Sequence, residues 1–326
     1  MTEWKEYKLG EIADVQTGPF GSQLHMSDYQ DEGTPIITVE HLGNNRIIHN
    51  NLPLVGEKDK NRLKKYVLAE GDIVFSRVGS VDRRAYVSAN EDGWMFSGRC
   101  LRVRPTQEVD SKFLSYYFGL EDFKETIRRI AVGATMPSIN TTILSNVVIP
   151  LPPIDTQHRI ASILSSLDDK IDLLHRENKT LEAMAETLFR QWFIEEAKED
   201  WEEGKLGDEF EFIMGQSPSG ESFNEEGVGI PMYQGNADFG FRFPTRRVFT
   251  TQPTRFAEIN DTLISVRAPV GAQNMATEKC CIGRGVAAFR YKDNSSFYSY
   301  TYYKLKSLLD DIKQYNDNGT VFGNSI

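Results

Sequence analysis

Arginine is the side chain of this sequence with the clearest capacity for binding chemistry, because its guanidinium bonds phosphates and guanine edges bidentately. Six arginines gather between residues 77 and 104, and seven more between residues 242 and 290. The formal net charge is −10, but residues 195–211 hold nine acids against two lysines, so the rest of the chain carries only −3. Phosphate responds to charges within a Debye length of about 10 Å, so a local basic surface is compatible with this total.

The other residue types that often carry chemistry are few and widely spaced. The histidines form no His-x-x-x-His pair, and no Gly-x-x-x-x-Gly-Lys-Ser/Thr segment is present to hold ATP. The cysteines have neither disulfide nor metal-ligand spacing, which predicts buried thiols in a reducing cytoplasm and no metal site. No apolar run approaches the roughly 18 residues of a membrane helix. These histidines and cysteines are His25, His41, His49, His158, His175, Cys100, Cys280 and Cys281.

The elements that must position the arginines occur twice along the chain. Lys-Leu-Gly-Glu at residues 8–11 recurs as Lys-Leu-Gly-Asp at 205–208, and Gly-Thr-Pro-Ile at 33–36 recurs as Gly-Ile-Pro-Met at 229–232. Further matches follow in the same order: 71–76 with 260–265, 98–99 with 283–284, 113–116 with 297–300, and 135–136 with 320–321. Such ordered similarity indicates an internal repeat. The loops between the matches differ, which suits one scaffold that binds two different targets.

Each copy contains patterns typical of strands and of one helix. Residues 36–39 and 72–76 are β-branched or aromatic runs bounded by Gly, Pro or Asn, which predicts strands. Residues 101–104 alternate strictly and predict a strand with an arginine-bearing face, and residues 112–130 have helical spacing. We expect an α+β fold, with two repeated domains of mainly antiparallel, twisted sheets separated by a long coiled-coil-like helix.

The segment between the copies has the clearest periodicity in the chain. Prolines at 150, 152 and 153 delay the helix, after which apolar residues recur at alternating steps of four and three. This heptad pattern extends for roughly 48 Å and requires a partner helix. Asn178 is its one polar member, which either fixes the pairing or is solvated where the seam opens. The seam consists of Ile160, Leu164, Leu167, Ile171, Leu174, Asn178, Leu181, Ala185, Leu188 and Trp192.

These features together resemble the specificity subunit of type I restriction–modification systems. The matching stretches are the two Lys-Leu-Gly-Glu/Asp segments, residues 33–36 and 71–77, Gly-Ala-Thr at 133–135, and Ile-Pro-Leu-Pro-Pro at 149–153 before Gln157 and Ile160. The expected domains are a first target-recognition domain at 1–154, a helical spacer arm at 155–197 and a second recognition domain at 198–326. The second copy ends at a position equivalent to about residue 139, so we expect it to lack its last segment and a second arm.

The resemblance implies a non-catalytic protein. Pro152-Pro153 is followed by Ile154-Asp155, so the Asn/Asp-Pro-Pro-Tyr/Phe loop with which a DNA amino-methyltransferase holds a flipped base is absent. We therefore expect no cofactor on this chain, and S-adenosylmethionine, ATP and Mg on partner subunits. The expected partners are double-stranded DNA, methyltransferase and restriction subunits, and a second copy that pairs through the arm. The expected location is the cytoplasm.

Under this interpretation each repeat reads one half of a bipartite DNA target, and the arm sets a spacing on the order of 14 base pairs. A coiled-coil adaptor without a DNA role is the alternative. Arginine suits guanine and Asn or Gln suits adenine, but the sequence does not separate base contacts from phosphate contacts. The candidate DNA-binding residues are Ser22, His41, Asn44, Arg46, Arg77, Arg83, Arg84, Arg99, Thr135, Gln216, Ser219, Gln234, Asn236, Arg242, Arg267 and Asn274.

Overall fold

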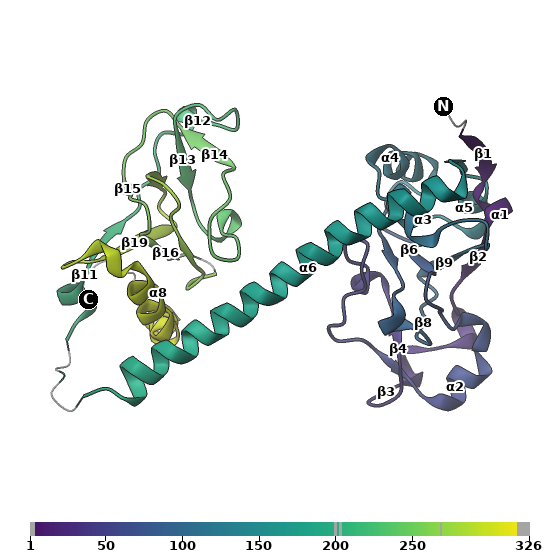
Figure 1. The fold of residues 1–326 in the computed structure, drawn as a ribbon, viewed down its shortest axis with the longest axis horizontal. Coiled ribbons are helices and arrows are strands. Elements are labelled where there is room, and N and C mark those ends of the chain that lie inside the picture. Colours follow the sequence, from purple (N-terminus) through teal and green to yellow (C-terminus); the bar gives the residue numbers. More distant parts are fainter. Residues whose placement is uncertain (1–3, 199–200, 202–203, 268, 318–326) are drawn as a thin grey trace. The chain divides into compact units, whose positions relative to one another are not determined.

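The computed structural model describes residues 4–198, 201, 204–267 and 269–317 of the chain. These residues divide into two compact units, here called the N-terminal unit (Met1–His175) and the C-terminal unit (Arg176–Ile326). The boundary falls inside one continuous helix, α6 (Ile154–Arg190), which Figure 1 labels. Each half of α6 is therefore described with the unit on which it packs.

The N-terminal unit is built around a four-stranded antiparallel sheet in the order β2-β9-β6-β7. Strand β6 is buried along its whole length, and its alternate residues serve two different cores. Ile73 and Phe75 pack with the helices α3 and α4, while Val74 packs with a second sheet. The strands are β2 (Ala13–Thr17), β9 (Cys100–Pro105), β6 (Ile73–Ser76) and β7 (Arg84–Tyr86), and the helices are α3 (Ser111–Tyr117) and α4 (Glu121–Ile130).

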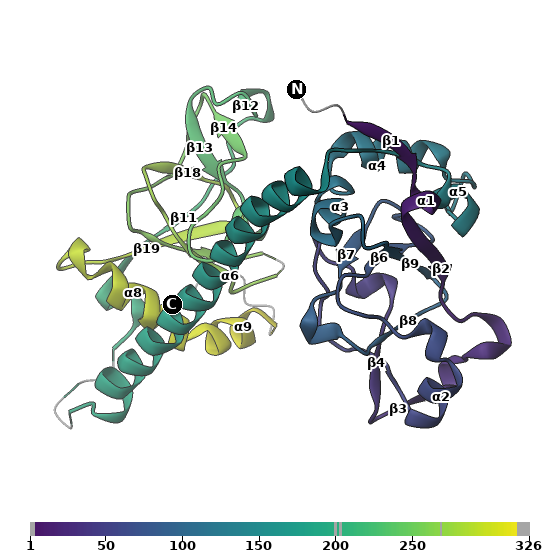
Figure 2. The same ribbon diagram turned by 45° about the vertical axis from the view of Figure 1, so that its right-hand side comes forward.

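The second sheet of this unit has the order β3-β5-β4-β8. Its pairs are antiparallel except β4 with β8, which run parallel. Figures 1 and 2 both show the β6–β9 sheet between α3 and α4 on one side and this second sheet on the other. The remaining elements are β3 (Tyr29–Gln30), β4 (Thr34–Ile37), β5 (Leu54–Val55), β8 (Met95–Phe96), α1 (Leu9–Ile12), α2 (Glu57–Arg62), α5 (Thr141–Ser145), and the pair β1 (Lys5–Lys8) with β10 (Val148–Leu151).

The C-terminal unit repeats this plan. One sheet has the order β11-β19-β16-β17 and the other β12-β14-β13-β18-β15, in which only the β13–β18 pair is parallel. The elements are α7 (Leu206–Glu209), β11 (Phe210–Met214), β12 (Phe223–Asn224), β13 (Ile230–Tyr233), β14 (Val248–Thr250), β15 (Phe256–Ala257), β16 (Thr262–Ser265), β17 (Gln273–Met275), β18 (Cys280–Ile282), β19 (Val286–Tyr291), α8 (Tyr298–Ser307) and α9 (Leu309–Asp317). The predicted α+β class, with mainly antiparallel sheets and a long intervening helix, is confirmed.

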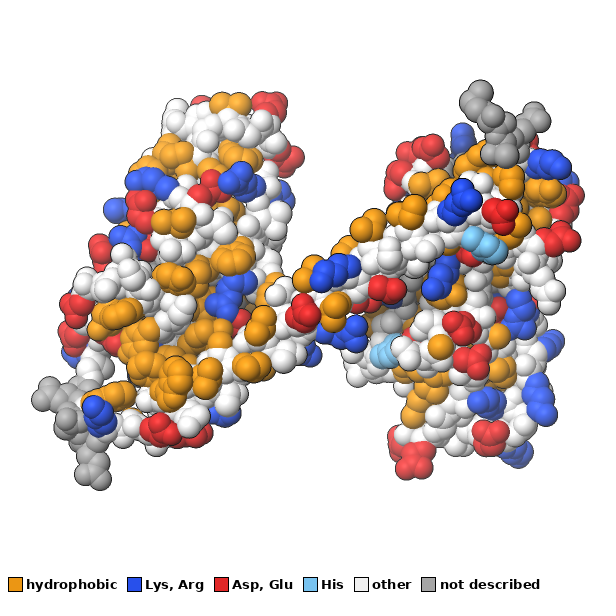
Figure 3. All heavy atoms as spheres, in the orientation of Figure 1, with side chains coloured by type: hydrophobic (Ala, Val, Ile, Leu, Met, Phe, Trp, Pro, Cys, Tyr) orange, Lys and Arg blue, Asp and Glu red, His pale blue; other side chains and the backbone are white. Residues whose placement is uncertain are grey.

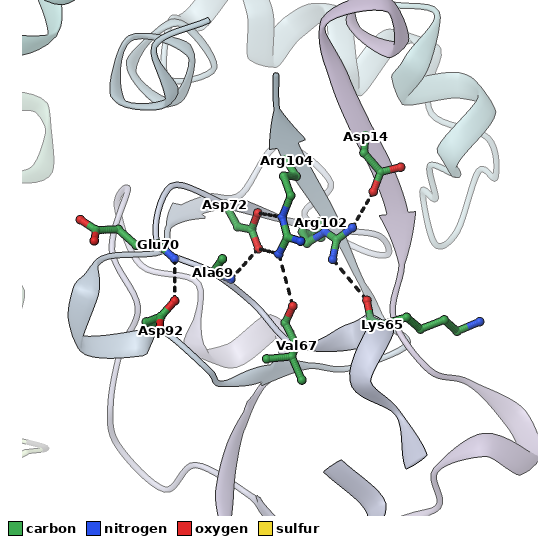
Figure 4. Close-up of polar contacts among 9 residues, drawn as sticks. All are labelled: Asp14, Lys65, Val67, Ala69, Glu70, Asp72, Asp92, Arg102 and Arg104. Carbon is green, nitrogen blue, oxygen red and sulfur yellow. Dashed lines mark hydrogen bonds and ion pairs between the residues drawn. The ribbon is translucent and has the colours of Figure 1, made fainter. Parts of the chain in front are cut away.

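An ion pair of the same geometry, in which the carboxylate is buried, holds the central sheet of each unit. The Asp72 carboxylate accepts from Nε and Nη2 of Arg104 at 2.7 and 2.6 Å, and from the Ala69 amide at 2.8 Å (Figure 4). Asp261 accepts from Arg290 at 2.7 Å twice and from the Glu258 amide at 2.7 Å. The two aspartates are 1% and 3% exposed. Each carboxylate thus joins the turn before one strand to the neighbouring strand.

The predicted helix over 112–130 is two helices. α3 ends at Tyr117 and α4 begins at Glu121, because Phe118 caps the first and Leu120 has an extended backbone before the second. Gly119 lies between them, where a Cβ would come within 2.2 Å of Arg84 Nη2. Glycine at this position leaves room for the buried Arg84 guanidinium where the two helices meet.

The repeat alignment also needs a shift of three residues at this helix. Arg84 and Gln273 occupy the same register position, since β7 pairs with β6 as β17 pairs with β16. Arg84 Nε donates to the Ser115 carbonyl at 3.2 Å, and Gln273 Nε2 donates to the Tyr302 carbonyl at 2.7 Å. Ser115 therefore corresponds to Tyr302, and Tyr116 corresponds to Tyr303 rather than to Tyr300.

Helix α6 has 37 residues and continues into a π-helical turn, Gln191–Glu195. Its heptad seam is mostly open in the described part of the chain, with Leu167, Ile171, Leu174 and Leu181 exposed by 44–61%. Figure 3 shows hydrophobic side chains at the surface of this helix. Asn178 is also exposed. The seam thus offers an apolar stripe to a further helix.

Replacement of Asp72 by Asn should lower the free energy of unfolding of the N-terminal unit by roughly 1.5–3 kcal/mol, the range for a hydrogen bond to a charged group, because the Arg104 left without its partner is 41% exposed and can be hydrated. Asp261→Asn should have a similar effect on the C-terminal unit. The control Asp59→Asn breaks an exposed pair with Arg62 and should cost less than about 1 kcal/mol. Hydrogen–deuterium exchange in denaturant resolves the two units, and equal effects of Asp72→Asn and Asp59→Asn would contradict the prediction.

Candidate nucleic-acid interface

Four loops of the N-terminal unit meet at one end of the β2-β9-β6-β7 sheet. We call residues 18–22, 77–83, 97–99 and 131–138 the first loop cluster. The Arg77 amide donates to the Arg99 carbonyl at 2.8 Å, and the Gly79 amide donates to the Pro137 carbonyl at 2.8 Å. The Ile139 amide donates to the Arg77 carbonyl at 3.0 Å. Backbone hydrogen bonds between separate loops give this surface a defined shape while leaving its side chains free to vary.

Arg77 lies at the centre of the first loop cluster. Its Nη1 donates to the Gly98 carbonyl at 3.1 Å, and its guanidinium lies 5.6 Å from the centroid of the Phe20 ring. Phe20 itself is 56% exposed. Arg99 and Thr135 are exposed in the same cluster, whereas the side chain of Ser22 lies outside the described residues. The cluster therefore presents cationic, polar and aromatic groups together.

The C-terminal unit has an equivalent surface. We call residues 215–220, 234–236, 266–267, 269–272 and 283–285 the second loop cluster. The Gln216 amide donates to the Ile282 carbonyl at 3.0 Å, and the Val266 amide donates to the Gly285 carbonyl at 2.9 Å. The second of these bonds is equivalent to the bond from Arg77 to Arg99. The exposed candidates here are Gln216, Ser219, Gln234, Asn236 and Arg267.

Glycines allow the loops of each cluster to touch. A Cβ on Gly18 would lie 2.2 Å from the Ser97 carbonyl oxygen, and one on Gly215 would lie 2.1 Å from that of Gly283. No side chain fits at either position without moving backbone, so the same requirement holds in both copies.

Three candidates are turned into the protein instead. His41 is 4% exposed, and its Nδ1 lies 2.9 Å from Thr38 Oγ1. Asn274 is 1% exposed and bonds both the amide and the carbonyl of Gly240, at 3.2 and 2.9 Å. Arg84 is 6% exposed, and burial lowers the pKa of its guanidinium. Their polar atoms are occupied by, or enclosed in, the scaffold.

Four further candidates bond groups outside the loop clusters or lie near such a contact. Arg83 donates to the Leu42 carbonyl, and Arg46 donates to the Asp168 carbonyl at 3.3 Å and pairs with Asp172 of α6. Asn44 is exposed in the same loop as Arg46. In the C-terminal unit, Arg242 pairs with Glu182 of α6.

Two exposed side chains of the clusters were not among the sequence candidates. Arg284 is exposed and lies one position before Gly285, the residue equivalent to Arg99, and its amide donates to Ser217 Oγ at 3.3 Å. The repeated Gly-Arg pair at 98–99 and 283–284 was the signal that could have identified it. Phe20 had no such signal, because an apolar residue in a loop is expected to be buried.

The arrangement of the two loop clusters can bind a polyanion or read polar base edges. Among the described residues, no group of three His, Cys, Asp or Glu side chains is suited to hold a metal ion. Within the same residues, no helix combines the length and apolar character needed to cross a membrane.

Comparison with known proteins gives one consistent family. The model of the type I restriction modification DNA specificity domain matches residues 1–183 and again residues 198–324. A protein of Methanocaldococcus jannaschii, provisionally named the MjaX specificity subunit of a type I restriction enzyme, is 33% identical over 98% of this chain and 79% of its own length. The HindI specificity subunit of Haemophilus influenzae is 28% identical over 60% of this chain and 42% of its own length.

The fold has a counterpart among solved structures. The S subunit of a type I restriction–modification system from M. genitalium aligns with a TM-score of 0.64 and 20% identity. The alignment covers 97% of this chain and 80% of that one. At this identity the likeness concerns the fold, and it agrees with the two repeated units and the long helix described above.

Proposed function

This chain belongs to the type I restriction–modification DNA specificity family, and we propose from that premise that each loop cluster reads one half of a bipartite DNA target. The family assigns the chain to DNA-target recognition in a non-catalytic subunit. The adaptor interpretation is not favoured. The observation that carries the proposal is the occurrence of two equivalent loop clusters, built on the same sheet end, with different exposed side chains.

The guanidiniums of the two loop clusters are the proposed main contacts. Arg99 and Arg284 are exposed in equivalent loops, one position apart in the structural register. The partly buried Arg77 and the exposed Arg267 leave equivalent strands, so each cluster brings two arginines to the DNA. Gln216, Gln234 and Asn236 add amides, which suit adenine, to the second cluster only. The candidates that bond the scaffold or α6 are assigned to the protein framework, whereas the exposed Thr135 and Ser219 stay proposed contacts. The framework residues are His41, Arg46, Arg83, Arg84, Arg242 and Asn274.

The proposal gives α6 two further roles. Its 37 residues correspond to about 55 Å of helix, which would set the distance between half-sites. Its exposed surface would dock the methyltransferase subunits that carry S-adenosylmethionine, and the restriction subunit of the full complex would supply ATP- and Mg-dependent chemistry. With cellular DNA as the ligand, the proposed location is the cytoplasm.

Replacement of Arg99 by Gln should weaken binding to the DNA target about 5- to 100-fold if it contacts a guanine, and relax specificity at one base pair. If Arg99 contacts a phosphate instead, its loss should weaken binding to all DNA sequences alike. It should also reduce the slope of log affinity against log salt concentration by about 1. Fluorescence anisotropy over a range of salt distinguishes these cases, with Arg284→Gln as the parallel variant. Arg62→Gln, an arginine on α2 outside both clusters, serves as the control. If Arg99→Gln and Arg62→Gln bind alike, Arg99 has no DNA role.

Co-expression of the chain with a type I modification subunit, followed by sequencing of methylated genomic sites, should reveal two short half-sites with a spacer of fixed length. Exchange of residues 1–154 for the equivalent part of another member of the family should change one half-site only. A single continuous recognition sequence, or a change in both half-sites, would refute the division of labour between the two loop clusters.

We also propose that the open seam of α6 pairs with the same helix of a second copy. Leu174→Glu together with Leu181→Glu should then convert a dimer to a monomer in light scattering at micromolar concentration, because charges on a coiled-coil seam prevent packing. Lys179→Glu, an exposed residue of the same helix outside the seam, should leave the dimer intact. A wild-type chain that is monomeric under these conditions would eliminate the homodimer.

A further inference from the structure

The N-terminal unit holds α6 through a cluster of polar contacts. Arg46 pairs with the Asp172 carboxylate and donates to the Asp168 carbonyl at 3.3 Å. Tyr116 of α3 donates to the Asp168 carboxylate at 2.7 Å. Burial, followed by the hydrogen bond to Asp168, raises the pKa of Tyr116, so the phenol remains a proton donor at neutral pH. We call these residues the first clamp.

The C-terminal unit holds the later part of α6 in a similar way. Arg242 pairs with Glu182, donates to Tyr303 Oη at 2.7 Å, and lies 3.9 Å from the centroid of the Tyr302 ring. Lys306 pairs with Glu182 at 3.2 Å. These residues form the second clamp. Arg242 and Glu182 are only 20% and 16% exposed, against 42% and 39% for Arg46 and Asp172.

The two clamps come from equivalent places in the repeat. The loop of Arg46 joins strand β7 where the Tyr86 amide donates to the Asn45 carbonyl, and the loop of Arg242 joins β17 where the Met275 amide donates to its carbonyl. Tyr116 and Tyr303 correspond through the shifted alignment given above. The two arginines therefore lie in equivalent loops of the two copies, where Arg242 corresponds to Asn45, the residue before Arg46. Each arginine pairs with an acid of α6.

We infer that Arg46 and Arg242 are positioning residues, which fix the angle of each recognition unit on α6 and so determine the DNA spacer length that the protein accepts. The inference rests on the proposed function, because a spacer exists only if both loop clusters read DNA. Charged hydrogen bonds are directional, whereas an apolar interface tolerates sliding. An arginine that bonds two successive turns of α6, as Arg46 does, therefore fixes how far the unit is rotated about the helix and where along the helix it lies. Each clamp acts on its own unit.

This role differs from the DNA contact expected for the same residues from the sequence. A guanidinium that bonds the helix has fewer donors left for phosphate or guanine, and Arg242 is enclosed by two tyrosine rings as well. A DNA contact and a clamp also respond differently to mutation. Loss of a DNA contact weakens binding at every spacer length, whereas loss of a clamp changes the preference among spacer lengths.

The test uses the first clamp, since its exposed residues are expected to tolerate substitution. Full-length wild type, Arg46→Glu, Asp172→Arg and the double variant are each co-expressed with the modification subunit, and methylated sites are sequenced. Each single variant should raise methylation at sites whose spacer differs by one base pair by about fivefold relative to cognate sites, the effect of losing one exposed ion pair. The double variant should return toward wild type, and the half-sites should not change.

The controls separate the possible failures. Arg159→Glu makes the same charge change on an exposed residue of α6 and should leave spacer preference unaltered. If Arg46→Glu does not fold, Arg46→Gln removes the charge without placing an acid beside Asp172. Uniform loss of methylation without rescue in the double variant, or an unchanged spacer preference in both single variants, overturns the inference. Failure of the wild type to yield a bipartite site would overturn the proposed function instead.

Discussion

A buried aspartate that must be neutralised is the constraint on which both units depend. Asp72 and Asp261 are enclosed, and an unpaired carboxylate there would cost several kcal/mol, so Arg104 and Arg290 must occupy the facing positions of β9 and β19. The pair joins the turn before the central strand to its neighbour, and lies at the sheet end remote from the loop cluster. One end of each sheet is thereby fixed, and the other end is left to carry loops of different sequence.

The same requirement explains how an arginine-rich chain can carry a net charge of −10. Many of its guanidiniums are neutralised by acids of the protein itself: Arg102 pairs with Asp14 at 2.5 Å, Arg104 with Asp72, and Arg242 with Glu182. Arginine density along a sequence therefore overestimates the basic surface. Arg99 and Arg284 are two exposed arginines that lie where the glycines bring separate loops together. Local position, rather than total charge, makes an anion-binding surface here.

The fold could be predicted from the sequence because its signals are local and repeated. Strand alternation, the proline-delayed start of α6 and its heptad spacing depend on neighbours within a few residues. The break between α3 and α4 and the three-residue shift of the α3–α8 correspondence could not be predicted, because these helices pack through contacts between distant residues, such as those of Arg84 and Gln273. The partners of Arg46 and Arg242 lie 126 and 60 residues away, and no spacing rule covers such distances. For that reason the sequence did not distinguish arginines that hold the protein framework, such as Arg46 and Arg242, from arginines that are free to bind DNA.

Helix α6 has a charged surface that contacts the two units and an apolar stripe that is exposed, and these two surfaces suit different tasks. Its acids at 168, 172 and 182 bind the units through charged, directional contacts, while its leucines and isoleucines remain exposed on a continuous stripe. An apolar stripe supplies affinity for another helix but specifies angle poorly, whereas ion pairs contribute little net free energy and specify geometry well. Because the clamps fix the orientation of the units and the seam binds another helix, a substitution in one surface can leave the task of the other intact. A protein that must hold two readers in a fixed relation while joining a larger complex needs both.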